Sequence, residues 1–201
     1  MKTLLDAIVD VIRPDFYKDG VVRLEETAAG STCGPVTLNK SGRAVVLKLD
    51  GLPPPLCPQQ GCQLRYSVND RLFPLFKTET SGLSALCDYL IFYPEKGVED
   101  PRLFVFLCEL KSGSPSGSKK QAENGKLLAD YILAMARHHH KLTSVPRCEA
   151  RGLVFSPRCE PIKIPNPGRD KMAYIPFETG IAGMKFAYCR PGEYPLAYFC
   201  A

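Results

Sequence analysis

Two apolar, β-rich runs separated by turn-forming residues constrain the fold of this chain most. The runs cover residues 83–93 and 103–111, and residues 94–101 between them read Pro-Glu-Lys-Gly-Val-Glu-Asp-Pro. Because proline, glycine and acidic residues favour turns, the two runs are expected to form an antiparallel hairpin. Apolar residues occupy both faces of each run, which predicts two central strands of a sheet that is covered on both sides.

The segment after the hairpin predicts a crossover to a parallel strand. Residues 112–117 contain only serine, glycine and proline and indicate a loop, and Ser118-x-x-Gln121 is a capping-box pattern that opens a helix to about His138. Residues 151–156 read as the next strand, and a strand, helix, strand sequence normally makes a right-handed parallel crossover. The stripe of the helix that faces the sheet is apolar except at its first turn and comprises Gln121, Gly125, Leu128, Ile132 and Met135.

The two ends of the chain are less regular in pattern. Apolar residues at helical spacing, with Thr3 able to cap and Pro14 able to stop, predict a helix over residues 3–13. Residues 21–50 contain short β-rich runs separated by glycine and serine, which read as strands and turns. Residues 160–201 are rich in proline, glycine and aromatic residues and are expected to form an irregular part of loops and short strands.

Composition favours one soluble domain in a reducing compartment. A chain of 201 residues with 45% hydrophobic content can bury one sizeable core, so a single domain over residues 1–201 is expected. The formal charge of +5 attracts a polyanion but agrees equally well with ordinary solubility. The nine cysteines are odd in number, and the chain shows neither a secretion signal nor an apolar run long enough for a bilayer, so we expect reduced thiols, a cytoplasmic location and no membrane partner.

Three charged residues of the hairpin form the candidate site. If the turn centres between Val98 and Glu99, Asp88 lies directly opposite Glu109 on one face of the sheet, where like charges destabilise each other. Lys111 follows Glu109 by two positions and projects from the same face. One ammonium leaves the two carboxylates short of neutrality, and a divalent cation with hard oxygen ligands, as Mg²⁺ or Mn²⁺ prefers, would supply the missing charge.

Such a site predicts hydrolysis of a phosphodiester. A metal ion polarises a phosphodiester oxygen and lowers the pKa of bound water, while the Lys111 ammonium can orient that water or stabilise the developing charge. Gln121 lies in the first turn of the following helix, so its amide is expected to reach water, lysine or phosphate at the same edge of the sheet. The helix N-terminus adds its own attraction for anions.

At these residues the chain resembles the PD-(D/E)xK phosphodiesterases, which include restriction endonucleases, Holliday-junction resolvases and exonuclease domains. The similar segments are residues 87–92, 104–111 and 120–125, within a core region of about residues 83–156. The resemblance implies an α/β fold with a restriction endonuclease-like core, in which a mixed central β-sheet is flanked by helices in the order αβββαβ. It also implies the site residues: Asp88 and Glu109 as metal ligands together with the Leu110 backbone carbonyl, Lys111 as the water-positioning residue and Gln121 as its support.

The chain departs from the family pattern in several places. Cys87 stands where a proline usually precedes the first acid, and Gly125 stands where some members have the tyrosine of Gln-x-x-x-Tyr. Family members often draw a further acid from an upstream helix, and here Glu26 is preferred. The other acids that compete for this role are Asp6, Asp10, Glu25 and Glu79. Lys119 and Lys120 are candidates for phosphate contacts beside the site, although surface lysines are usually only solvated.

The predicted function is metal-dependent cleavage of nucleic acid, with DNA favoured over RNA by the resemblance. Kinship also implies a role in defence against foreign DNA or in repair, and cleavage of both strands would favour a homodimer. The chief alternative is a catalytically inactive nuclease-fold module that binds nucleic acid or a protein partner. A third hypothesis is a regulatory partner of a larger complex, which would bind without cleaving. The charged residues themselves could also be only a structural salt bridge between Lys111 and one of the acids.

A zinc site is the second metal hypothesis. Cys57 with Cys62, and Cys148 with Cys159, could together supply four thiolates, but their spacings differ from those of the common zinc knuckles.

Overall fold

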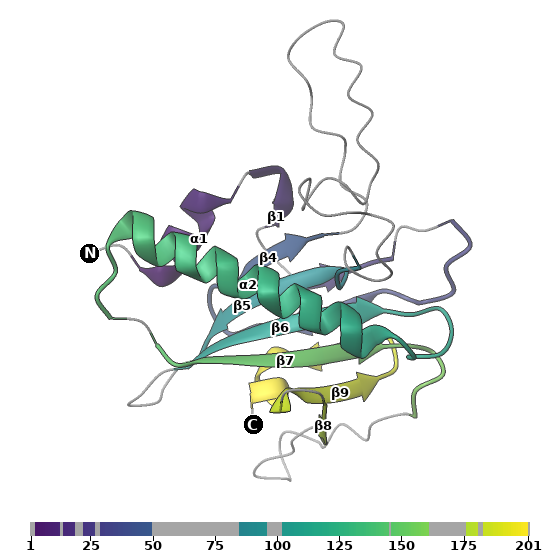
Figure 1. Cartoon of the computed structure of the whole chain (residues 1–201). Coiled ribbons are helices and arrows are strands. Elements are labelled where there is room, and N and C mark those ends of the chain that lie inside the picture. The colour runs from purple at the N-terminus through teal and green to yellow at the C-terminus, as the bar shows by residue number, and fades with distance from the viewer. Residues whose placement is uncertain are drawn as a thin grey trace, which may run out of the picture.

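The computed structural model describes residues 3–12, 14–18, 22–26, 29–49, 85–95, 102–144, 146–160, 176–180 and 183–200. Its largest element is a seven-stranded mixed sheet (Figure 1). The strand order of this sheet is β1 (Tyr17–Lys18), β4 (Val45–Lys48), β5 (Tyr89–Pro94), β6 (Leu103–Leu110), β7 (Cys148–Phe155), β9 (Lys185–Cys189) and β8 (Glu178–Thr179). A second, three-stranded sheet has the order β10 (Glu193–Pro195), β3 (Val36–Asn39) and β2 (Val22–Leu24).

The predicted hairpin lies at the centre of the large sheet. β5 and β6 are antiparallel, with Tyr89 opposite Cys108 and Pro94 opposite Leu103, which is the predicted register. Every residue of β6 is buried, as expected for a central strand with both faces covered. β6 pairs with β7 in parallel, so the predicted crossover to a parallel strand is also confirmed.

Among the described residues, the α-helices cover one face of this sheet, and the small sheet with a 3₁₀ helix covers the other. α1 (Leu4–Val11) and α2 (Ser118–His140) pack with Leu90 and Leu107 of the central strands, and α2 crosses the sheet face in Figure 1. On the opposite face, β2, β3 and the 3₁₀ helix η4 (Leu196–Cys200) pack with Ile91 and Phe106. The expectation of flanking helices is therefore correct for one face only, because β2 and β3 each bury one of their two faces and act as the second cover.

The two α-helices begin differently. Thr3 caps α1 through a capping box with Asp6, as the helix predicted over residues 3–13 requires. The capping box predicted at Ser118 and Gln121 is wrong, because the N-cap of α2 is Gly117 in a left-handed conformation with φ 82°, and no side chain caps the helix. The Ser118 hydroxyl donates instead to the Pro115 carbonyl at 2.6 Å. No helix among the described residues combines the length and apolarity needed to cross a bilayer.

The C-terminal part is more regular than predicted for residues 160–201. β9 is parallel to β7 inside the large sheet, and Phe186 and Ala187 in it are fully buried. β10 extends the small sheet beside β3, and η4 packs its Phe199 into the core. Residues 161–175 and 181–182 lie outside the described residues, so the prediction for them is neither confirmed nor corrected.

Candidate functional site

The two acids of the predicted pair lie at one end of the central hairpin. Because Tyr89 pairs with Cys108, one further antiparallel step places Asp88 opposite Glu109, as predicted. The Leu110 amide donates to Asp88 Oδ2 at 2.6 Å, so the carboxylate of one strand is tied to the backbone of the other. The Asp88 carbonyl also accepts a hydrogen bond from the Leu49 amide at 2.8 Å, which continues the β4–β5 ladder to this point.

Lys111 joins the acids from the end of β6. Its Nζ lies 2.5 Å from Glu109 Oε1 and donates to Gln121 Oε1 at 2.7 Å. Its backbone amide donates to the Phe155 carbonyl at 2.8 Å, so the main chain still follows β7 here. Alternation along the strand puts residues 109 and 111 on the face that α2 covers. The structure therefore brings Glu109, Lys111 and Gln121 together as predicted.

Two amide side chains of α2 hold the segment that leads into β5. Gln121 Nε2 donates to the Leu86 carbonyl at 3.3 Å, and Asn124 Nδ2 donates to the Ala85 carbonyl at 2.7 Å. Asn124 was not singled out from the sequence, because its partner lies 39 residues away along the chain. The two contacts place the first turns of α2 against the backbone just before Asp88.

Gly125 allows this close approach of helix and strand. A Cβ at this position would lie 2.6 Å from Cys87 Sγ and 3.1 Å from Leu107 Cδ2, distances at which neighbouring atoms would have to shift. The departure from the Gln-x-x-x-Tyr pattern thus has a steric reason, since a tyrosine here would collide with the segment that carries Asp88.

Glu109 is the most deeply buried acid of the site. The residue is only 2% exposed, and its Oε2 is buried without a hydrogen-bond partner. Burial raises the pKa of this carboxyl, and the Lys111 ammonium opposes the rise by hydrogen bonding and by charge. The Gln121 amide and the Asp88 backbone also lower the pKa, although neither forms a hydrogen bond to Oε2. Such an unsatisfied oxygen is costly in a protein interior unless a further partner binds it.

The donor set fits a cation that keeps most of its water. Among the described residues, no group of three or more His, Cys, Asp and Glu side chains is placed to hold a metal. A cation here would therefore have the carboxylates of Asp88 and Glu109, with a main-chain oxygen such as the Leu110 carbonyl, waters and substrate completing its shell. Mg²⁺ commonly binds through one or two carboxylates plus phosphate oxygens, and the unpartnered Glu109 Oε2 is a suitable acceptor.

The preferred additional acid, Glu26, does not join this pair. Its Oε2 accepts hydrogen bonds from the Ser112 hydroxyl at 3.0 Å and from the Ser31 hydroxyl. The structure thus gives no support to Glu26 as a metal ligand within the described part of the chain. The competing acids have other partners (Thr3 for Asp6, Arg23 for Glu25 and, at 3.7 Å, His140 for Asp10), and Glu79 lies outside the described residues.

The two lysines beside the site differ in exposure. Lys119 Nζ lies 5.8 Å from the centre of the Phe186 ring, and Lys119 lines a cavity of about 390 Å³ together with Glu178 and Tyr188. Lys120 is exposed at the start of α2, next to Gln121. Their proposed contact with phosphates stays a prediction.

The zinc hypothesis fails on the placement of its cysteines. Cys148 begins β7 and Cys159 lies just beyond its other end, where its amide donates to the Ser156 carbonyl at 3.1 Å. An eight-residue strand is roughly 23 Å long, too far for the two thiolates to share one ion. Cys57 and Cys62 lie outside the described residues.

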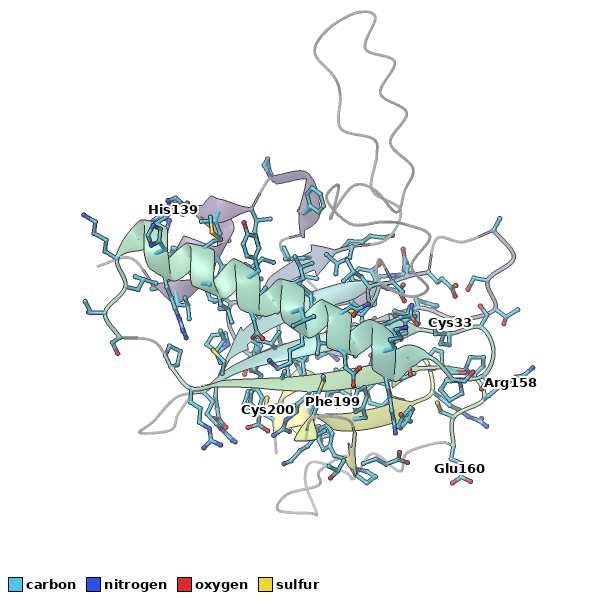
Figure 2. The ribbon with its side chains drawn as sticks, viewed as in Figure 1. Cys33, His139, Arg158, Glu160, Phe199 and Cys200 are labelled. Carbon is cyan, nitrogen blue, oxygen red and sulfur yellow. The ribbon has the colours of Figure 1, made fainter. Side chains whose placement is uncertain are left out.

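Figure 2 labels residues near both ends of α2. His139 marks one end of this helix, and Cys33 and Arg158 lie toward the other end. Gln121 belongs to the first turn of α2, which starts at Ser118. Comparison with known proteins adds no further assignment, since no family model, curated protein or solved structure matches the chain.

Proposed function

We propose that this protein is a Mg²⁺- or Mn²⁺-dependent nuclease that hydrolyses phosphodiester bonds, with DNA preferred over RNA. The observation that carries the proposal is the meeting of Glu109, Lys111 and Gln121 within hydrogen-bonding distance, opposite Asp88 on the neighbouring strand. Charged side chains are gathered around a buried carboxylate in this way at functional sites more often than elsewhere. The preference for DNA rests on the resemblance to the PD-(D/E)xK phosphodiesterases.

The order of elements supports a restriction endonuclease-like core. α1, β4, β5, β6, α2 and β7 follow one another as helix, three strands, helix and strand, and the four strands are neighbours in the sheet. The short strands β1 to β3 are inserted between α1 and β4. Both helices cover the same face, which departs from a sheet with helices on either side.

In the proposed reaction each residue has a separate task. Asp88 and Glu109 would hold the metal ion, which when bound polarises the phosphodiester and lowers the pKa of its water. Lys111 would direct the attacking water and stabilise charge on the phosphate, because its side chain is one-quarter exposed and can face the substrate. Gln121 keeps the lysine in place through its Oε1. Glu109 must be ionised to act as a ligand, and its ion pair with Lys111 supports the ionised form.

The alternative is a nuclease-fold module without catalysis. The 2.5 Å ion pair between Lys111 and Glu109 favours this alternative, because an ammonium paired in this way can neutralise the buried carboxylate without any metal. The protein would then bind nucleic acid or a protein partner, and the paired charges would only stabilise the end of β6.

Cleavage assays separate the two functions. The protein is incubated with supercoiled plasmid, linear DNA and RNA in Mg²⁺ or Mn²⁺, with EDTA as the metal-free condition. We expect cleavage only with metal, and a loss of at least about 100-fold in Glu109→Ala and Lys111→Ala. Glu25→Ala and Lys126→Ala are matched controls, since these charges pair with Arg23 and Asp130 and not with the site residues. Binding without cleavage would support the inactive module instead. Equal cleavage by all variants would indicate a contaminating nuclease.

A further inference from the structure

The residue directly after Lys111 is held from several sides. Ser112 Oγ accepts hydrogen bonds from the Thr32 amide at 2.9 Å and the Cys33 amide at 3.3 Å, and it donates to Glu26 Oε2 at 3.0 Å. Its carbonyl accepts a hydrogen bond from Thr32 Oγ1 at 3.1 Å. A serine with its hydroxyl and carbonyl both engaged by another segment is fixed in position rather than solvated.

Glu26 and Ser31 complete this arrangement. The Ser31 hydroxyl donates to Glu26 Oε2 and lies 2.8 Å from the Ser112 hydroxyl. One carboxylate oxygen therefore accepts hydrogen bonds from two serines. These three residues are partly buried, which strengthens hydrogen bonds relative to an exposed loop. Burial is the main cause of the raised pKa of Cys33, and the charges of Glu26 and Asp88 raise it further, so both carboxylates lie within electrostatic reach of Cys33.

Gly113, which follows Ser112, is also held in place by a hydrogen bond. The Ser156 hydroxyl donates to the Gly113 carbonyl at 2.6 Å, and the Lys111 amide is bonded to Phe155 on the preceding side. The backbone of Lys111 is thus held on both sides, although β6 ends one residue earlier, at Leu110. A lysine side chain has a flexible four-carbon stem, so the position of its backbone decides whether Nζ reaches Glu109 and Gln121.

We propose that Glu26, Ser31 and Ser112 form a positioning network that holds Lys111 in the geometry needed for catalysis without touching metal or substrate. The inference rests on the proposed function for its catalytic consequence, but the positioning itself does not depend on activity. It gives Glu26 a task different from metal ligation. Partners of this kind around metal sites commonly alter activity when they are removed, although they contact no reactant.

The first test measures the reactivity of the Lys111 amine. Wild-type protein is labelled briefly with an acylating reagent, and mass spectrometry compares Lys111 with the exposed Lys120 in the same sample. We expect Ser112→Ala, which removes a hydroxyl, and Glu26→Gln, which removes the charge that strengthens two hydrogen bonds, to raise the ratio of Lys111 to Lys120 labelling roughly fivefold. Ser112→Thr, which keeps the hydroxyl, is expected to restore the wild-type ratio.

Matched controls come from the neighbouring residues. Ser114→Ala and Glu25→Gln change an exposed serine and an exposed acid beside the network and should leave the ratio unchanged. Gln121→Ala removes a direct partner of Lys111 and serves as the positive control. Thermal melting of every variant confirms that labelling is compared between folded proteins. An unchanged ratio in Ser112→Ala and Glu26→Gln, with a raised ratio in Gln121→Ala, overturns the proposed positioning.

The second test measures catalysis in the same variants. With plasmid DNA and Mn²⁺, kcat is expected to fall roughly 10-fold to 100-fold in Ser112→Ala and Glu26→Gln, while KM and the Mn²⁺ concentration for half-maximal rate keep their wild-type values. Raised labelling with unchanged kcat overturns the catalytic role of the network. If wild-type protein cleaves nothing, the nuclease proposal fails and the labelling result alone decides whether the network positions Lys111.

Discussion

The Lys111 ammonium donates a hydrogen bond to Gln121 Oε1 at 2.7 Å, and this contact ties the end of β6 to the first turn of α2. The Gln121 side chain also donates from its Nε2 to the Leu86 carbonyl, so this one amide joins three segments of the chain. The lysine that is proposed to act on the attacking water is therefore held by a helix that also holds the entry to β5.

Exchanging Gln121 for alanine should reduce cleavage much more than it reduces stability. The variant loses the contact with Lys111, and we expect kcat to fall at least about 10-fold. Asn124→Ala is the matched control, because Asn124 makes the same kind of amide contact to Ala85 but none to Lys111. Each variant should lose about 1 kcal/mol of unfolding free energy in urea. Equal losses of activity in the two variants would remove Gln121 from the site.

A methyl group at position 125 should press the helix away from the strand. Gly125→Ala places a Cβ 2.6 Å from Cys87 Sγ, and we expect a loss of roughly 1–3 kcal/mol despite the better helix propensity of alanine. The loss should shrink in a Cys87→Ala background, where the closest atom is absent. Gly113→Ala, with nothing within 4 Å of its Cβ, is the control and should be nearly neutral. Thermal unfolding of the four variants measures the coupling, and additive effects would contradict the close approach.

The stability of the protein should depend on pH through Glu109. Burial raises the pKa of this carboxyl above its ordinary value of 4.5, against the opposing effect of Lys111. The folded state then holds the proton to higher pH than the unfolded chain. The stability that protonated Glu109 contributes is fully present below the pKa of this carboxyl in the unfolded chain. It is lost as pH rises through the pKa of the same carboxyl in the folded protein. Glu109→Gln should therefore gain in unfolding free energy relative to wild type as pH rises above the ordinary carboxyl pKa of 4.5.

Asp6 provides a control of opposite sign. Its hydrogen bonds with Thr3, and next the Arg43 contact, lower the pKa of Asp6 to about 2. Its contribution is present above the unfolded pKa and is lost as pH falls through the folded one, so Asp6→Asn should lose more stability at neutral than at acidic pH. Urea unfolding at several pH values measures both differences. A pH-independent difference between Glu109→Gln and wild type would contradict the raised pKa.

The ion pair of Glu149 and Arg151 should stabilise the far end of the sheet. Arg151 is fully buried, and its Nε and Nη2 donate to Glu149 Oε1 at 3.0 and 2.5 Å. Glu149→Ala leaves a buried guanidinium without its carboxylate, and we expect a loss of about 3 kcal/mol. Glu25→Ala breaks an exposed pair with Arg23 and should cost less than about 1 kcal/mol. Similar losses in chemical denaturation would show that Arg151 does not depend on Glu149.

The central hairpin could be predicted from sequence because its determinants are local. Turn formers between two apolar runs set the register, and this register alone places Asp88 opposite Glu109. The start of α2 shows the limit of such patterns. Ser118 and Gln121 have the spacing of a capping box, but Pro115 and Lys111 are their partners in the folded protein. The Ser118 hydroxyl is taken by a carbonyl of the preceding loop and the Gln121 amide by Lys111 and Leu86, so neither side chain completes the capping box.

The parts that could not be predicted depend on distant partners. β9 is short, and its burial comes from β7 beside it and not from its own pattern. Ser112 lies in a segment of loop-forming residues, and only the folded chain brings it to Glu26, 86 positions away. Glu26 was therefore assigned to metal binding from sequence, whereas in the structure its carboxylate accepts hydrogen bonds from Ser31 and Ser112.

A crystal structure of the wild-type protein soaked in Mn²⁺ tests most directly whether Asp88 and Glu109 share a cation. We expect one anomalous peak roughly 2 Å from an oxygen of each carboxylate, with Glu109 Oε2 as one of the ligands. The peak should be absent from crystals of Glu109→Gln grown and soaked in the same way. No peak between these residues at millimolar Mn²⁺, with the Lys111–Glu109 ion pair intact, would contradict a metal-dependent site.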